Sequence, residues 1–254
     1  NMCSMAKVLM AMSGGVDSSV AAAILQEEGH EVIGCFMRLG NVGDELDEQT
    51  DISIGHKGCC SINDAHDARY VSAKLGMKFY ALDFKQDFGR IIDYFVDEYN
   101  SGRTPNPCVR CNDWLKFGRL HEYAHSIGAE YVASGHHAQI KKGDDGAELH
   151  MGADATKDQS YVLFGAKKER VGEMMLPIGH LQKSEVRELA KSFDLPVFNK
   201  PDSQEICFVP DDNYSNLINK RVPGSLVEGD VLDVEGNVIG KHQGQQKFTI
   251  GQRR

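Results

Sequence analysis

"AKVLMAMSGGVDSSVAAAILQEEG" (residues 6–29) contains the pattern that most strongly indicates the architecture of this chain. Residues 6–12 are almost wholly apolar, which is the pattern of a strand buried on both faces of a parallel sheet. A glycine turn follows, and residues 18–29 then have the pattern of a helix that ends at Gly29. A strand, a tight turn and a helix in this order predict the opening of an α/β domain.

The chain as far as about residue 200 continues this alternation. Strands are predicted at 31–39, 78–84 and 129–138, and helices at 61–76, 88–102, 111–128 and 183–196. We therefore expect an α/β fold with a doubly wound, mostly parallel, Rossmann-like sheet, in which ligands bind beyond the carboxyl ends of the strands. The end of the chain is rich in glycine and short β-like runs. The sequence therefore predicts two domains, a catalytic domain at 1–206 and a small β-rich domain at 207–254.

Composition limits the class of protein. The chain has 254 residues, a net charge of −9 and seven cysteines. It has no run near the roughly 20 apolar residues needed to cross a bilayer and no secretory signal pattern, which indicates a cytoplasmic protein without a membrane partner. In that compartment a close cysteine pair more often binds metal or takes part in catalysis than forms a structural disulfide. The negative charge argues against general nucleic-acid affinity but leaves a local basic face open.

The turn "SGGVDSS" (13–19) has the chemistry of an anion-binding loop. Gly14 and Gly15 let the backbone approach a phosphate, and the N–H groups of the loop and of the helix N-terminus point at it. Ser18 adds a hydroxyl donor. A carboxylate at Asp17 suits a Mg²⁺ ion held against phosphate oxygens. The alternative is a glycine turn capped by serines, without a ligand.

The second motif is "TPNPCVRCN" (104–112). Asn106 is suited to cap a helix and Pro107 to occupy its first position, so that Cys108 and Cys111 share one face of the helix start, where a thiolate is favoured. Zinc binding would need more ligands, for which the vicinal cysteines 59 and 60 are available. Buried, idle thiols are the other alternative, and Cys35 in an apolar run is best explained in that way.

The heptamer resembles the PP-loop of the ATP pyrophosphatases, which cleave ATP between its α- and β-phosphates. Six blocks in order are similar to those of the tRNA-specific 2-thiouridylases: "SGGVDSS", "GRTPNPCVRCN…KF", "ASGHHA", "KDQSYVLF", "SQEICFV" and "TIGQRR". The resemblance covers essentially the whole chain. It implies an enzyme that uses ATP and Mg²⁺ to replace the C2 oxygen of the tRNA wobble uridine with sulfur, which a sulfur-relay protein donates as a persulfide.

The resemblance also assigns roles to single residues. ATP contacts are implied for Ala11, Met12, Ser13, Gly14, Gly15, Val16, Asp17, Ser18, Met37 and Gly135. Contacts to tRNA are implied for Asn106, Pro107, Cys108, His136, Lys157, Asp158 and Gln159. Cys207 is expected to carry the persulfide, and Cys111 to be its partner thiol. His137 is expected to pack or hydrogen-bond locally.

Two departures from the family qualify these roles. Many members have an aspartate where this chain has Cys108, which leaves two chemistries open: Cys108 exchanges protons in that aspartate's place, or Cys108, Cys111 and Cys207 hold a [4Fe–4S] cluster. Members also continue past "TIGQRR" into a further β-domain.

Two other functions stay open, an adenylating enzyme that transfers nitrogen to a small molecule and a non-catalytic nucleotide- or metal-binding module.

Overall fold

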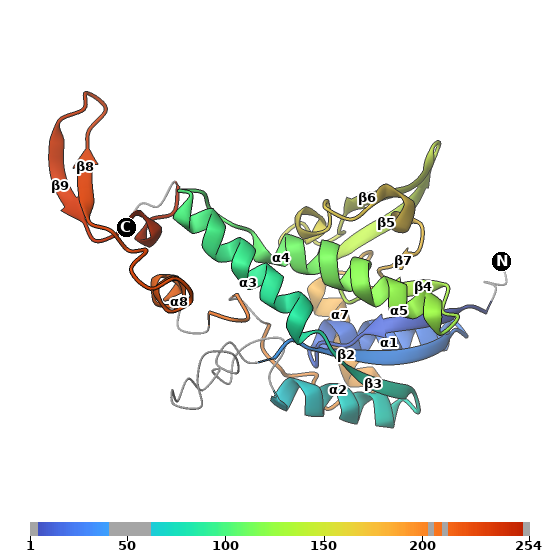
Figure 1. Ribbon diagram of the computed structural model, residues 1–254. Coiled ribbons are helices and arrows are strands. Elements are labelled where there is room, and N and C mark those ends of the chain that lie inside the picture. Colours follow the sequence, from blue (N-terminus) through green and yellow to red (C-terminus); the bar gives the residue numbers. More distant parts are fainter. Residues whose placement is uncertain (1–4, 41–61, 203–205, 210–212, 251–254) are drawn as a thin grey trace.

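The computed structural model describes residues 5–40, 62–202, 206–209 and 213–250, and a parallel five-stranded sheet lies at its centre (Figure 1). The strands are β1 (Lys7–Ala11), β2 (Glu31–Arg38), β3 (Lys78–Asp83), β4 (Tyr131–Ala133) and β7 (Met174–Met175). Their order is β3-β2-β1-β4-β7, and every neighbouring pair is parallel. The doubly wound α/β prediction is therefore confirmed, and the strand order reverses between β1 and β4.

Helices cover both faces of the sheet because the central strands are apolar on both sides. Leu9 and Ala11 pack on one face with helix α3 (Lys85–Asn100) and the segment 107–126. Val8 and Met10 pack on the other face with helices α1 (Val16–Glu27), α2 (Ile62–Lys74) and α7 (Lys183–Ser192). Alternate residues of one strand thus enter two cores, as the unbroken apolar run predicts.

The segment 107–126 departs from the helix predicted at 111–128. It begins with α4 (Pro107–Arg110), continues as the π-helical stretch η1 (Cys111–Arg119) and ends as α5 (Leu120–Ser126). Asn106 does cap its start, since its Oδ1 accepts a hydrogen bond from the Val109 N–H at 3.2 Å. The wider π-turns lie beside the pocket described below, which is where such stretches are common.

The predicted strand 129–138 is much shorter in the structure. After β4 the chain leaves the sheet, because Gly135 lies against the start of α1, where a Cβ atom would be 2.5 Å from the Ser18 nitrogen. The chain then forms an antiparallel hairpin of β5 (Ala138–Gly143) and β6 (Gly146–Met151), followed by short helical turns, η2 (Ser160–Val162) and α6 (Lys168–Val171). The hairpin was not predicted.

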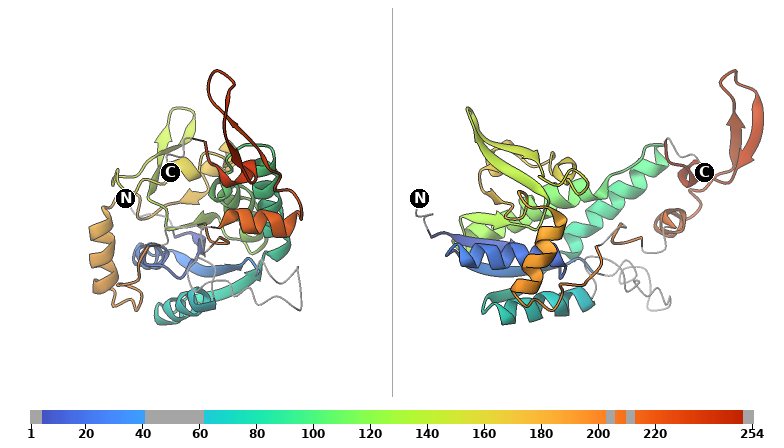
Figure 2. Two further views of the ribbon diagram at one scale, coloured as in Figure 1. Left: turned by 90° about the vertical axis from the view of Figure 1, so that its left-hand side faces the viewer. Right: turned by 180° about the vertical axis from the view of Figure 1, so that it is seen from behind.

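The C-terminal part holds helix α8 (Tyr214–Arg221), strands β8 (Gly229–Leu232) and β9 (Val238–His242), and the turn η3 (Gln245–Lys247). The β8–β9 hairpin projects from the far end of α3, away from the sheet (Figure 2). The small β-containing unit was expected, whereas α8 was not. Within the described residues, no helix combines the length and apolarity needed to span a membrane.

Candidate active site

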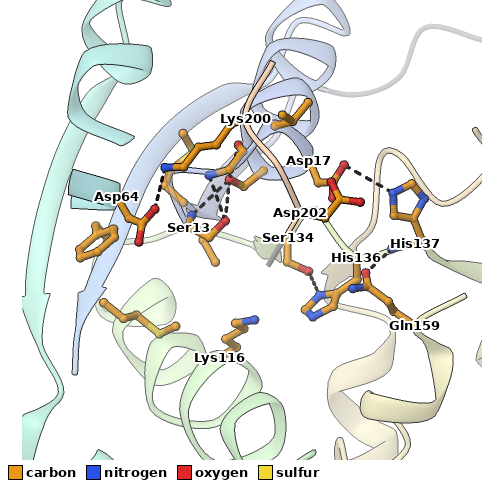
Figure 3. A pocket seen from close by; sticks show the side chains of 18 of the residues that line it. Ser13, Asp17, Asp64, Lys116, Ser134, His136, His137, Gln159, Lys200 and Asp202 are labelled. Atoms are coloured by element: carbon orange, nitrogen blue, oxygen red, sulfur yellow. Dashed lines mark hydrogen bonds and ion pairs between the residues drawn. The ribbon is translucent and has the colours of Figure 1, made fainter. Parts of the chain in front are cut away.

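A cavity of about 300 Å³ opens beyond the carboxyl ends of β1, β2 and β4, at the place where the strand order reverses (Figure 3). This is where a doubly wound sheet binds its ligands. The lining comes from segments far apart in the sequence: Ala11, Met12, Ser13, Gly15, Val16, Asp17, Ser18, Phe36, Met37, Leu39, Asp64, Cys111, Lys116, Ser134, Gly135, His136, His137, Lys157, Gln159, Lys183, Lys200, Pro201 and Asp202.

Close backbone contacts hold the loop between β1 and α1. Gly14 has φ +74°, and a Cβ atom there would lie 2.2 Å from the Asp64 carbonyl oxygen. Only glycine fits such a position. The Ser18 hydroxyl accepts from the Ser13 N–H at 3.2 Å, and the Ser19 hydroxyl donates to the Gly15 carbonyl at 2.7 Å. The N-terminus of α1 is thereby aimed at the cavity, which favours an anion.

Lys183 joins two carboxylates on the cavity wall. Its Nζ lies 2.7 Å from each Asp17 carboxylate oxygen and 2.9 Å from Asp202 Oδ1. Asp202 also accepts from Lys157 Nζ at 2.9 Å and from Arg187 Nη2 at 3.0 Å. Three basic side chains therefore surround Asp202, and the network connects α1, the residue 157 loop and α7.

These neighbours hold both carboxyl groups ionised. Burial alone would raise the pKa of Asp17, but a hydrogen bond with His137 and the charge of Lys183 lower it below 3.8. Burial likewise opposes ionisation of Asp202, and its hydrogen bonds from Lys157 and Lys183 lower the pKa to about 2. The two carboxylates are the oxygen donors that Mg²⁺ prefers, so the residues fit such an ion, although the Lys183 ammonium group already lies between them.

Lys200 supports the opposite side of the loop. Its Nζ donates to the Gly14 carbonyl at 3.0 Å and pairs with Asp64 Oδ1 at 2.6 Å and with the Asp67 carboxylate. The ammonium group thus bonds the loop and α2 together. Lys200 therefore explains why Gly14 and Asp64 approach so closely.

Lys116 differs from the other basic residues of the cavity. Within the described part of the chain its ammonium group has neither an ion pair nor a hydrogen bond, although it is half-buried on the cavity wall. Cys111 lines the same cavity five residues earlier. In an α-helix two such side chains would point about 140° apart. The i→i+5 pattern of the π-helical stretch brings positions five apart onto one side, so both reach the cavity.

The two histidines after β4 have different surroundings. His136 is buried, its Nδ1 lies 2.7 Å from the Ser134 hydroxyl, and burial together with Lys116 and His137 lowers its pKa well below 6.5. The ring is therefore neutral at pH 7. His137 is also buried, and its Nε2 lies 3.5 Å from Asp17 Oδ1. His137 was expected only to pack or hydrogen-bond locally, yet it faces the carboxylate of the loop.

The residues assigned to ATP gather in this cavity. Nine of the ten line it, and Gly14 lies between two that do. The residues assigned to tRNA divide into two groups. His136, Lys157 and Gln159 line the cavity, whereas Asn106, Pro107, Cys108 and Asp158 are not among its lining residues. The Asp158 carboxylate accepts from the Gly152 and Ser160 N–H groups, so it orders its own loop.

The cysteines lie at different depths. Cys108 is exposed, while Cys111 and Cys207 are partly buried and pack against the same hydrophobic core. Phe208 anchors the Cys207 segment, because its ring meets Phe88 and Phe95 of α3 edge-to-face at 5.5 and 5.2 Å. Cysteines 59 and 60, considered as extra zinc ligands, lie outside the described residues.

Sequence reasoning did not single out several cavity residues, namely Asp64, Lys116, Ser134, Lys183, Lys200 and Asp202. Lys116 follows the cysteine motif in the quoted block "NPCVRCN…KF", which was the available signal. Ser134 lies in the quoted block "ASGHHA", and the other four are single charged residues without a local pattern. Only the order of the strands brings them to the loop.

The chain is thus a Rossmann-like α/β protein with an anion-binding loop after its first strand. Two family models match it, the tRNA methyl transferase HUP domain over residues 6–211 and the tRNA methyl transferase PRC-barrel domain over residues 215–254. The tRNA-specific 2-thiouridylase MnmA of Rhodopirellula baltica is 47% identical over 98% of this chain and 68% of its own length. The protein of that name from Symbiobacterium thermophilum is 48% identical, with 98% and 64% covered.

The chain belongs to the tRNA-specific 2-thiouridylase family. It spans between 64% and 68% of the length of these two relatives. Among solved structures, NMN synthetase from Francisella tularensis is similar over 84% of this chain and 75% of its own, with a TM-score of 0.45 and 20% identity.

Proposed function

We propose that this protein is an ATP-dependent sulfurtransferase that replaces the C2 oxygen of the tRNA wobble uridine with sulfur. One observation carries the proposal: seven of the eight loop residues 11–18 and Cys111 line the same cavity. An adenylated base formed at the loop would then lie beside a thiol. The printed names of the relatives support tRNA as the substrate.

ATP is proposed to bind with its phosphates at the loop and the N-terminus of α1. Gly14 and Gly135 let the backbone of α2 and of the segment after β4 pack directly against the loop and α1, since a Cβ atom would lie 2.2 Å from the Asp64 carbonyl oxygen and 2.5 Å from the Ser18 nitrogen, respectively. Lys116 is suited to pair with a phosphate, because it is half-buried on the cavity wall and has no carboxylate partner among the described residues. When bound, Mg²⁺ would supply positive charge to the phosphate oxygens, and Asp17 and Asp202 are the residues that would hold it.

Adenylation solves the problem of the leaving group. The uridine O2 attacks the α-phosphate of ATP and pyrophosphate leaves, so that the oxygen can later depart as AMP. The terminal sulfur of a Cys207 persulfide then attacks C2 and displaces AMP. The Cys111 thiolate next attacks Cys207 Sγ, which forms a Cys111–Cys207 disulfide and releases the 2-thiouridine. A thiol reductant restores both cysteines. The shared core beneath the two residues supports this pairing.

The tRNA contacts are proposed in two groups. His136, Lys157 and Gln159 are proposed to meet the target base inside the cavity, since they line it. Asn106, Pro107, Cys108 and Asp158 are proposed to contact the tRNA outside it. The exposed Cys108 would also be available to a persulfide-donating protein.

The proposal is tested by supplying ATP, unmodified tRNA and a protein persulfide, and measuring both pyrophosphate and 2-thiouridine. We expect Cys207→Ser to lose thiolation and keep tRNA-dependent pyrophosphate release. Cys35→Ala is the control, because burial raises the pKa of that core thiol to about 12 and keeps it unreactive. Absence of pyrophosphate release would indicate a non-catalytic module. Full activity without Cys111 and Cys207 would indicate transfer of nitrogen to a small molecule.

A second measurement separates the persulfide from the [4Fe–4S] cluster. Protein purified without oxygen is analysed for iron and sulfide as wild type and as Cys108→Asp. We expect an iron-free wild type that thiolates tRNA, with activity kept in Cys108→Asp. About four irons per chain, lost together with thiolation in the variant, would make Cys108 a cluster ligand and overturn the persulfide route.

A further inference from the structure

A second group of chemically active side chains lies at the other end of the sheet. His121 and His125 are one turn apart on α5, and Glu173 directly precedes β7. His121 Nε2 lies 2.6 Å and His125 Nε2 lies 2.9 Å from Glu173 Oε2. One ligand atom from each residue falls within 4.8 Å of the other two. α5 leads into the start of β4, so the group is at the amino ends of β4 and β7, whereas the cavity is at the carboxyl ends.

The buried histidine lacks a hydrogen-bond partner. His121 is 5% exposed, and its Nε2 makes no hydrogen bond to the described residues, although Glu173 Oε2 lies 2.6 Å away. A buried polar atom without a partner is costly, and bound metal is one way to satisfy it.

We propose that His121, His125 and Glu173 form a binding site for a divalent transition-metal ion, with Zn²⁺ as the preferred occupant. Two imidazole nitrogens and one carboxylate oxygen are a common zinc donor set and leave the fourth tetrahedral position to water. The Glu173 carbonyl already accepts a hydrogen bond from the Val132 N–H of β4 at 3.0 Å. The ion would therefore join α5 to the place where β4 and β7 pair.

The glutamate beside the proposed site is not placed to support hydrolysis. The sequence "HEYAH" (121–125) has the HExxH pattern, in which the glutamate acts as general base in metalloproteases. Here Glu122 is exposed, its Oε2 accepts from Arg119 Nη1 at 2.9 Å, and its Oε1 lies 3.8 Å from Arg170 Nη2. Two guanidinium groups therefore hold this carboxylate, which leaves it a poor base for a metal-bound water.

The test is a Co²⁺ titration of the full chain after chelator treatment, followed by visible absorption, with Zn²⁺ as competitor. Cys108, Cys111 and Cys207 are replaced by serine in every sample, so that these thiols bind no metal. We expect one Co²⁺ per chain, displaced by Zn²⁺. At a Zn²⁺ concentration about a hundred times the dissociation constant, the melting temperature should rise by roughly 5–10 °C.

Two variants decide the assignment. His125→Ala removes an exposed ligand, so the fold should tolerate it, and we expect the Co²⁺ affinity to fall at least 100-fold. The matched control is His150→Ala, because His150 Nε2 lies 3.0 Å from Glu148 Oε2 on an exposed hairpin that offers no third ligand. Unchanged affinity in His125→Ala, equal losses in both variants, or no saturable binding in the parent protein would each overturn the site.

Discussion

Asp17 is the loop residue whose chemistry is most dependent on its neighbours. Its carboxylate accepts two hydrogen bonds from Lys183, which keep it ionised. A negative charge thus lies beside a loop that is built to bind an anion. A carboxylate at that place makes sense only if positive charge is added to it, by lysine or by a metal ion. The role of Asp17 is therefore electrostatic, and it contributes little to the hydrophobic core.

We predict that Asp17→Asn lowers the rate of pyrophosphate release at least 100-fold while the protein stays folded. The amide keeps the shape of the side chain but loses the charge, and losing the charged hydrogen bonds costs about 1–3 kcal/mol. Pyrophosphate release and thermal melting are measured on the same samples. Asp145→Asn, which changes an exposed hairpin residue, is the control. If activity fell only in proportion to the loss of folded protein, Asp17 would be a structural residue.

The lowered pKa of Asp202 makes the free energy of unfolding depend on pH. Its pKa is about 2 in the folded protein against an ordinary 3.8, so the folded state binds the proton more weakly than the unfolded state. The resulting stabilisation, about 1–2 kcal/mol, is complete above pH 4 and is lost as the pH falls towards 2. Urea unfolding between pH 5 and pH 2 should show this drop in wild type and a smaller one in Asp202→Asn. Parallel curves for the two proteins would contradict the assignment.

At the scale of elements, the junction of β1, the loop and α1 depends on one glycine. Gly14 has positive φ and lies against the Asp64 carbonyl, whereas Gly29, at the end of α1, also has positive φ but meets no atom within 4 Å. An alanine at Gly29 would therefore cause backbone strain alone, whereas an alanine at Gly14 would cause both strain and a steric clash. Positive φ alone costs an alanine about 1–2 kcal/mol.

We therefore predict different outcomes for the two alanine variants. Gly29→Ala should lose about 1–2 kcal/mol of unfolding free energy and keep its ATP affinity. Gly14→Ala should lose more than this and bind ATP at least tenfold more weakly, because its Cβ forces the loop away from α2. Denaturant unfolding and ATP titration measure both properties. Equal ATP affinity in the two variants would show that the contact of Gly14 with Asp64 does not shape the binding site.

The second feature at the level of the elements is the π-helical stretch of residues 111–119. Gly118 allows it, because a Cβ there would lie 2.7 Å from the Asp113 carbonyl oxygen, five residues earlier. Periodicity predicts a helix at this place correctly, but it does not distinguish α-helical from π-helical turns over nine residues. The difference decides which side chains face the cavity, and Cys111 and Lys116 reach it together for that reason.

At the scale of the whole molecule, α3 connects the sheet to the C-terminal part (Figures 1 and 2). The ring of Tyr99 stacks on Tyr214 of α8 with centroids 4.8 Å apart. The Arg221 guanidinium donates to Asp93 Oδ1 at 2.8 Å, and the Gln246 side chain donates to Asn100 Oδ1 at 2.9 Å. α8 also buries Leu217 and Ile218 in the core that it shares with α3, whereas the β8–β9 hairpin projects beyond it, so the C-terminal part is expected to open before the sheet does.

We predict that Tyr214→Ala speeds amide hydrogen exchange in residues 213–250 by roughly two- to tenfold, since an aromatic pair contributes about 0.5–1.5 kcal/mol. Exchange in β1, β2 and α1 should not change. Mass spectrometry of peptides after exchange measures both regions at once. Tyr70→Ala, on the exposed side of α2, is the control. A uniform increase along the chain would contradict a local effect of the Tyr99–Tyr214 stack.

Much of the fold and of the site was already contained in local patterns. The apolar run before Gly14 specifies a buried strand, the serine-rich turn specifies a helix start, and Asn106 with Pro107 specifies the start of α4. These features depend on backbone preferences and hydrophobic periodicity within a few residues, so they can be read from the chain directly. The resemblance of the six motifs then placed the chain in its family.

Local patterns were therefore enough to establish the α/β class, the anion-binding loop and the family of this protein. The tertiary structure alone creates the charge network, because Lys183 and Asp17 are 166 positions apart and meet through the strand order. It alone also turned Cys111 and Lys116 to one side, buried His137 behind Asp17, and brought His121 and His125 to Glu173. Ion pairs and ligand sets depend on distance in space, and no local propensity encodes a contact between segments that the sheet alone brings together.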